Sequence, residues 1–213
     1  MRSPAPDRRL IGAAGLTALL LFGVGNSLWA FDSPDSGAPA GELLRFYADK
    51  SSSVEVGVSL SFAALAAFLY FAVGLRELLA RFDADGVLAT TAFAGALVAA
   101  LCGLGSQAIN LAGGMLASNG NLGASTARTA FELARVFGFY AAPVGFGLLL
   151  IAIAAISLRA RAIMPGWLAR VTIAVGLALF TPVAPAALHP AVLLLIVVAV
   201  LVIRAPDPEA APA

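Results

Sequence analysis

Long apolar runs constrain this chain most strongly, because a segment inside a lipid bilayer must satisfy all of its backbone hydrogen bonds internally. A helix that crosses the hydrocarbon core needs about 20 predominantly apolar residues. The chain offers about six such runs, at residues 10–31, 54–75, 86–112, 126–157, 166–183 and 190–203. The last two are short, and a re-entrant hairpin is the alternative for them. The sequence predicts an all-α fold, a polytopic membrane helix bundle forming one domain over residues 10–203.

The amino-acid composition is that of a protein surrounded by lipid. Hydrophobic residues make up 61% and charged residues 12%, against about 45–50% and about 25% in soluble domains. The net charge of +1 argues against nucleic acid as a partner. His189 is the only histidine and Lys50 the only lysine, which excludes paired-histidine metal chemistry and a Schiff base within the bundle. We predict no catalytic residue, no metal and no cofactor.

Basic residues predict the orientation, because Lys and Arg concentrate in cytoplasmic loops. With six spans and a cytoplasmic N-terminus, nine of the thirteen fall inside and four outside. Residues 1–9 and the proline-rich tail 204–213 are then both cytoplasmic, and the tail is expected to be disordered. A cleaved secretory signal is the alternative for the first run. No A-x-A site stands at the end of that run, and five spans would still remain.

The first outer loop contains "PAGELLRFYADK". Leu43, Phe46 and Tyr47 fall on one face of a helix, and the charged residues fall on the other. This pattern predicts a short amphipathic helix lying on the membrane surface. Capping the outer end of the bundle and docking a partner are its two candidate roles.

The run at 86–112 carries Gly95, Ala99 and Gly103 at intervals of four, followed by Gln107 and Asn110. Small residues at this spacing let helix backbones approach closely, and buried amides bond across to a neighbour. We predict that the Gly95–Ala99–Gly103 face packs against another helix. The alternative is that the face lines a cavity.

Polar and ionisable residues gather towards the predicted outer side, which makes them the candidate ligand-binding set. They are Glu55, Gln107, Asn110, Arg128, Glu132 and Arg135. Residues 126–157 would form a helix of roughly 48 Å, longer than the hydrocarbon core of about 30 Å. The first reading is therefore a helix end in water, with Glu132 paired to Arg128 or Arg135 on the same helix. The second reading is a buried network in which Glu55 pairs with one of these arginines.

Pro143 stands in the middle of the fourth run, with glycines on both sides of it. A proline there removes a backbone hydrogen bond and typically kinks the helix. Such an irregularity is either a tolerated bend or, as in transporters, part of a binding site.

Three stretches carry a resemblance that spans nearly the whole length: "RRLIGAAG", "SPDSGAPAGELLRFYADKSSS" and "RAIMPGWLAR". The chain resembles multi-spanning membrane protein families of bacteria with Ala- and Gly-rich proteomes, which carry no established activity. The resemblance implies a multi-pass protein of the bacterial inner membrane. It implies no catalytic residue.

Three classes of function stay open. We expect first a non-enzymatic membrane protein that acts through a membrane partner or as a homo-oligomer. The alternative is a small transporter or lipophilic-ligand binder that uses the outer polar cluster. A membrane-embedded enzyme without a recognised motif is the third.

Overall fold

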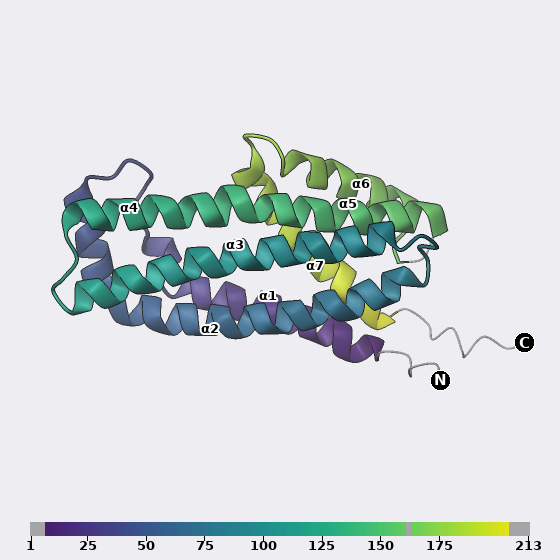
Figure 1. Ribbon diagram of the computed structural model, residues 1–213, viewed down its shortest axis with the longest axis horizontal. Coiled ribbons are helices and arrows are strands. Elements are labelled where there is room, and N and C mark those ends of the chain that lie inside the picture. Colours follow the sequence, from purple (N-terminus) through teal and green to yellow (C-terminus); the bar gives the residue numbers. More distant parts are fainter. Residues whose placement is uncertain (1–6, 161–162, 205–213) are drawn as a thin grey trace, which may run out of the picture.

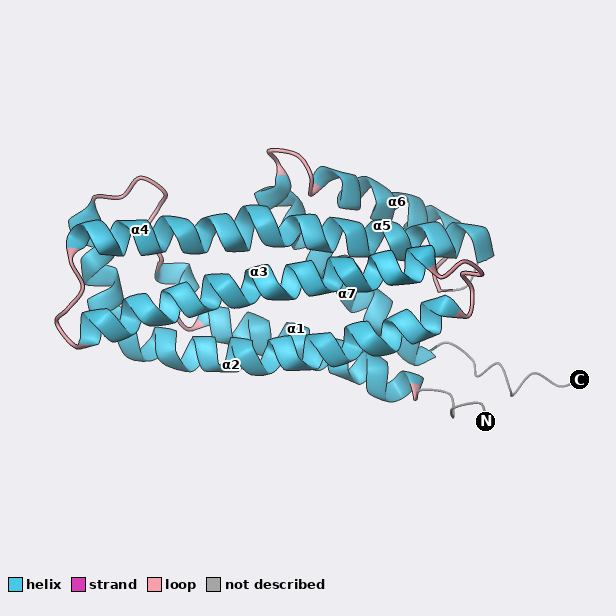
Figure 2. Cartoon of the chain, viewed as in Figure 1, coloured by secondary structure: helices cyan, strands magenta, loops and turns pink. Residues whose placement is uncertain are grey.

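The computed structural model describes residues 7–160 and 163–204, and every regular element in them is helical. Residues 1–6 and 205–213 lie outside the described residues, and so do the predictions made for them. The predicted all-α bundle is confirmed (Figure 2). The elements are α1 (Arg8–Ser27), η1 (Ala30–Asp32), α2 (Ala40–Ala80), α3 (Val87–Ser118), α4 (Ala124–Arg135), η2 (Val136–Ala141), α5 (Ala142–Ala160), α6 (Gly166–Ala178) and α7 (Ala184–Arg204).

The long helices lie side by side along one axis (Figure 1). α2 packs between α1 and α3, and α3 packs in turn against α5. α4, η2 and α5 run on from one another as one rod over Ala124–Ala160. The start of α1 and the end of α7 meet at the same end of the bundle, because a Cβ added to Gly12 would lie 2.3 Å from a side-chain carbon of Ile203. Both described chain ends therefore lie together (Figure 1).

Five helices, counting the rod as one, are long and apolar enough to cross a membrane. Many of their large side chains are exposed, including Leu20 at 67% and Leu193 at 63%. Exposed apolar surface on this scale is unusual for soluble proteins, whereas lipid tails cover such surface without cost. The five long apolar helices thus indicate a membrane-spanning protein.

The segment predicted as a separate surface helix is instead the first part of α2. α2 runs for 41 residues without a break, which is about 60 Å. Its apolar face covers neighbouring helices instead of lipid, because Leu43, Phe46 and Tyr47 are all buried. Phe46 packs edge-on against Phe131 of α4, with the ring centroids 6.3 Å apart. One end of the bundle therefore extends well beyond the length that a bilayer requires.

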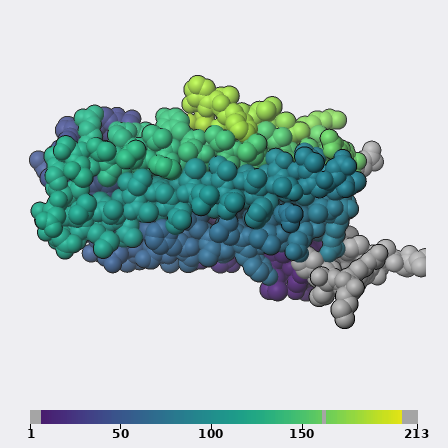
Figure 3. Space-filling model, viewed as in Figure 1, coloured from purple at the N-terminus to yellow at the C-terminus, as the bar shows by residue number. Residues whose placement is uncertain are grey.

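The last two helices also differ from the predicted ranges. α6 ends at Ala178 and has only 13 residues, whereas α7 begins at Ala184 and has 21. Pro185 stands in the first turn of α7, where its missing N–H removes no helical hydrogen bond. Pro190 lies inside the helix, so it is not the start that the sequence suggested. The connection between α6 and α7 protrudes from the side of the bundle (Figure 3).

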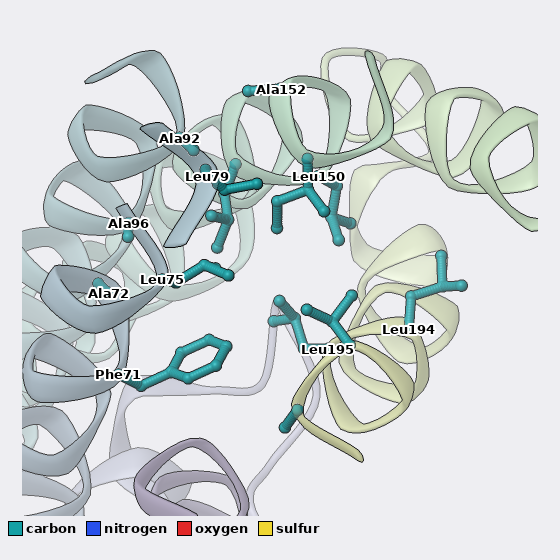
Figure 4. Close-up of a cluster of buried hydrophobic side chains, with 14 of the residues drawn as sticks. Phe71, Ala72, Leu75, Leu79, Ala92, Ala96, Leu150, Ala152, Leu194 and Leu195 are labelled. Atoms are coloured by element: carbon teal, nitrogen blue, oxygen red, sulfur yellow. The ribbon is translucent and has the colours of Figure 1, made fainter. Parts of the chain in front are cut away.

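Two apolar cores hold the bundle together. The larger lies towards the chain ends and joins α1, α2, α3, α5, α6 and α7. Phe71, Leu75 and Leu79 of α2 point towards Leu150 of α5 and Leu195 of α7 (Figure 4). The smaller core lies at the extended end and is built around Trp29, Phe46, Tyr47 and Phe131. The second core explains why α2 and α4 stay helical beyond the length of a membrane span.

The small-residue face of α3 is only partly a packing surface. A Cβ added to Gly95 would lie 2.6 Å from the carbonyl oxygen of Gly145, so α3 and α5 touch backbone to backbone there. Ala99 belongs to the same contact, because a Cβ at Gly145 would lie 2.3 Å from its backbone nitrogen. At Gly103 the nearest atom is a Leu65 methyl, 3.6 Å away. The face therefore packs backbone to backbone on α5 at its first two residues, whereas Gly103 meets only a side chain of α2 and borders a cavity, which was the alternative.

Candidate ligand-binding site

Charged residues bracket an uncharged band of the bundle. On α2 no charged residue lies between Glu55 and Arg76, a length of about 30 Å. On the α4–η2–α5 rod none lies between Arg135 and Arg159, a length of about 36 Å. Both lengths suit a hydrocarbon core of about 30 Å. We call the level of Glu55 and Arg135 the outer boundary, because it lies away from the two chain ends.

The charges of α4 lie at and beyond this outer boundary. Arg128 is exposed, and Nη1 of Arg135 lies 3.5 Å from Oε2 of Glu132. The side chains of this pair are 28% and 43% exposed. The predicted pair on the same helix is therefore confirmed, with Arg135 as the partner. Glu55 is exposed and makes no ion pair among the described residues, so it is not the cross-helix partner that we predicted.

A layer of buried polar groups on α3 lies at the same level. Asn110 is 4% exposed, accepts a hydrogen bond from the Tyr47 hydroxyl at 2.9 Å and donates to the Ser106 carbonyl at 3.1 Å. Gln107 is 3% exposed, and its Nε2 donates to Oδ1 of Asn26 at 3.3 Å. The structure thus joins α1, α2 and α3 through two amides that the sequence had singled out.

The amide oxygen of Gln107 stands apart from this network. It is buried, and no group in the described part of the chain donates a hydrogen bond to it. Leaving a buried polar atom without a hydrogen-bond partner costs more free energy than a typical hydrogen bond contributes to stability. Such an atom therefore requires an explanation. Within residues 7–160 and 163–204, the indole N–H of Trp29 is the other such group, and it packs directly over Gly57 of α2.

The rod widens into a π-helical turn opposite this layer. Pro143 has no N–H for the carbonyl four residues before it, so the regular helical register cannot continue through it. The N–H of Ala142 instead donates to the carbonyl of Phe137, five residues back. The irregularity predicted at Pro143 therefore takes the form of a π turn, a feature that often occurs at functional sites. Within the turn Gly138 faces Ser106, whose hydroxyl donates to the carbonyl of Ala134 at 2.8 Å.

Two cavities meet between α1, α3, η2 and α7. The outer cavity, of about 540 Å³, is bordered by Arg135, by the η1 region and by Asp35 in the loop that follows. The inner cavity, of about 170 Å³, lies deeper between apolar side chains such as Phe68 and Phe146. Both are bordered by the same five residues, Phe22, Ser106, Gln107, Gly138 and Leu188. Gln107 therefore lies between a more polar outer cavity and an apolar inner one.

The structure brings together only some of the predicted site residues. Gln107, Asn110 and Arg135 border the outer cavity, whereas Glu55, Arg128 and Glu132 do not. Sequence reasoning did not assign Ser106 or Gly138 to the site. Gly138 had one signal, its position five residues before Pro143. In the described segments, no group of three or more His, Cys, Asp or Glu residues is placed to hold a metal ion.

Comparison with protein-family models, with curated proteins and with solved structures finds no match for this chain. The resemblance to bacterial multi-spanning families therefore stays a prediction.

Proposed function

We propose that the protein is a membrane-embedded binding protein that holds a small amphipathic molecule in the two joined cavities. The observation that supports this most directly is that a larger, more polar cavity and a smaller apolar one share the lining residues Ser106, Gln107 and Gly138. Binding sites in proteins are mostly apolar hollows with a few placed polar groups. The outer and inner cavities have that composition. The proposal favours the ligand-binding alternative over action through partners alone, because the interior is not fully closed.

The location of the site supports uptake from the outer side. Val87 to Gln107 covers about 30 Å of α3, which places Gln107 close to the outer boundary. The inner cavity reaches back to Ala99 and Gly103, within the uncharged band. A molecule bound there would keep its polar end near water and its apolar end at membrane depth.

We propose that this outer side faces away from the cytoplasm of a bacterial cell, across its inner membrane, with both termini cytoplasmic. The distribution of basic residues supports this orientation. Seven described arginines stand at the end of the bundle where the chain ends meet, and they are Arg8, Arg9, Arg76, Arg81, Arg159, Arg170 and Arg204. The extended end has four basic residues, which are Arg45, Lys50, Arg128 and Arg135.

Native mass spectrometry after gentle extraction tests the binding proposal. We expect the wild-type chain to retain a small-molecule adduct. Gly103→Leu adds four carbons to the inner cavity and should release that adduct. Gly41→Leu makes the same change at an exposed position with no atom within 4 Å of the added Cβ, and it should keep the adduct. A wild-type chain that carries no adduct, or a Gly103→Leu chain that keeps it, would contradict the proposal.

A homo-oligomer or a membrane partner stays a prediction beside this proposal. The same spectra report the stoichiometry of the extracted protein.

A further inference from the structure

α1 and α7 touch near the chain ends and separate towards the outer boundary. A Cβ added to Gly12 would lie 2.3 Å from a side-chain carbon of Ile203 and 2.6 Å from the carbonyl oxygen of Ala199. Gly23 lies on the same side of α1, because the two glycines are 11 positions apart, about three full turns of a helix. A Cβ added to Gly23 would have no atom of another described helix within 4 Å. The side of α1 that contacts α7 at Gly12 is therefore open at Gly23.

The inner cavity lies at this opening. Its border includes two residues of α1, Phe22 and Gly23, and two of α7, Leu188 and Val192. Phe22 is 40% exposed, and Gly23 is exposed as well. These two residues therefore extend from the cavity to the outside of the bundle, and the cavity opens sideways between α1 and α7.

The opening faces hydrocarbon instead of water. Arg9 to Gly23 covers about 21 Å of α1, and Leu188 to Arg204 covers about 24 Å of α7. Both arginines stand at the end of the bundle where the chain ends meet. In a hydrocarbon core of about 30 Å, the opening is thus in the half nearer the outer boundary. The molecules that lie against it are the lipids of the outer leaflet.

The volume of the inner cavity limits how much of a lipid can enter it. Its volume is about 170 Å³, and its walls are mostly apolar side chains and glycines. An engineered apolar cavity of about 150 Å³ in another protein holds one benzene molecule. The inner cavity therefore has room for about six carbons of an acyl chain.

Arg135 offers a partner for a lipid headgroup at the outer cavity, which it borders. Its Nη1 contacts Oε2 of Glu132 at 3.5 Å, which is long for a hydrogen bond. A guanidinium carries several N–H donors, so Arg135 keeps donors for another acceptor. Its planar fork matches the oxygens of a phosphate. A phosphate in the outer cavity would thus lie beside Arg135.

From these features we infer that the ligand is a phospholipid of the outer leaflet. One acyl chain enters the inner cavity sideways between α1 and α7, and the phosphate lies beside Arg135. The lateral opening favours a lipid over a water-soluble molecule, because the chain enters without leaving apolar surroundings. This inference rests on the proposed function, since it names the class of molecule that the two cavities bind.

A phosphatidylethanolamine with a photoreactive diazirine on one acyl chain tests the inference. Its ammonium complements Asp35, which borders the same outer cavity. The full chain is placed in bilayers that contain this probe and irradiated, and the labelled residues are identified by mass spectrometry. Phe68 borders the inner cavity and is only 7% exposed, so lipids around the bundle do not reach it. We expect the wild type to be labelled at Phe68.

One matched probe and two variants locate the headgroup and the route. A diacylglycerol with the same chain lacks the phosphate and should label Phe68 several-fold less. Gly23→Leu places four carbons in the opening and should abolish the label at Phe68. Ala13→Leu enlarges an exposed residue of the same helix that does not border the cavity, and it should keep the label. Equal labelling by both probes, or an undiminished label in Gly23→Leu, would overturn the inference.

The native spectra separate this inference from the proposed function. A water-soluble adduct that Gly103→Leu releases, without label at Phe68, would overturn the lipid and leave the binding function standing. Absence of both label and adduct would overturn the two proposals together. The label on the wild type needs no variant, so the test stays decisive if Gly23→Leu fails to fold.

Discussion

One substitution made at two glycines of α3 should change stability in opposite directions. At Gly95 a new Cβ would lie 2.6 Å from the Gly145 carbonyl oxygen and 2.7 Å from the Leu149 nitrogen. Both are backbone atoms, so α5 must move by about 0.8 Å to restore an ordinary contact of 3.4 Å. Overpacking typically costs about 1–3 kcal/mol, and replacing a helical glycine with alanine returns about 0.5–1 kcal/mol. Because both close contacts are with backbone atoms, we take about 2–3 kcal/mol for the overpacking, so Gly95→Ala should lose about 1–2.5 kcal/mol in total.

Two turns further along, Gly103 offers the matched control. Its nearest neighbour would be a Leu65 methyl at 3.6 Å, an ordinary contact, so only the helical gain of about 0.5–1 kcal/mol remains. One kcal/mol shifts the unfolding midpoint by about 2–4 °C in a domain of this size. The midpoint temperature of thermal unfolding in detergent should therefore fall by about 2–10 °C for Gly95→Ala and rise by about 1–4 °C for Gly103→Ala. A Gly95→Ala chain as stable as the wild type would refute the backbone contact between α3 and α5.

Three further predictions concern the outer end and the topology. Glu132→Gln should change the free energy of unfolding by no more than about 1 kcal/mol, because its pair with Arg135 is half exposed; a loss of several kcal/mol would instead indicate a buried network. Tyr47→Phe strands a buried amide oxygen on α3 and should cost about 1–3 kcal/mol, and unchanged thermal stability would argue against that bond. In a chain whose native cysteine is replaced by alanine, a membrane-impermeant thiol reagent should label Asn119→Cys from outside and Ala84→Cys only from inside. The reverse labelling would overturn the proposed orientation.

Most helices of this chain are predictable from the sequence, because the length of an apolar run and the position of a proline can both be read within one segment. The boundary of α2 escaped prediction for a tertiary reason. Ser51, Ser52 and Ser53 have the composition of a loop, yet the helix continues through them because Phe46 and Tyr47 before them pack in the smaller core. Propensity is a weak prior that such packing overrides.

The candidate site was predictable only in part. Gln107 and Asn110 stand out as amides inside an apolar run, and that local signal was enough to select them. Their partners were not predictable, since Asn26 is 81 and Tyr47 is 63 residues away in the chain. The cavity itself arises because α3 and α5 touch at Gly95 and leave space at Gly103. The four-residue spacing is the same at Gly95 and at Gly103, so it cannot predict which of the two positions packs closely and which borders a cavity.

The position of α7 has a consequence for how the protein is made. Leu188 and Val192 of α7 complete the wall of the inner cavity, together with Ala18 and Leu19 of α1. α7 is the last described helix to leave the ribosome, and at about 5–20 residues per second it follows α1 by about 10–30 s. Between the synthesis of α3 and that of α7, the Gln107 face lacks the wall that Leu188 and Val192 supply. The cavity is complete only after α7 has docked. The ligand therefore cannot stabilise the chain before that step, and any molecule that binds the nascent chain earlier must bind elsewhere.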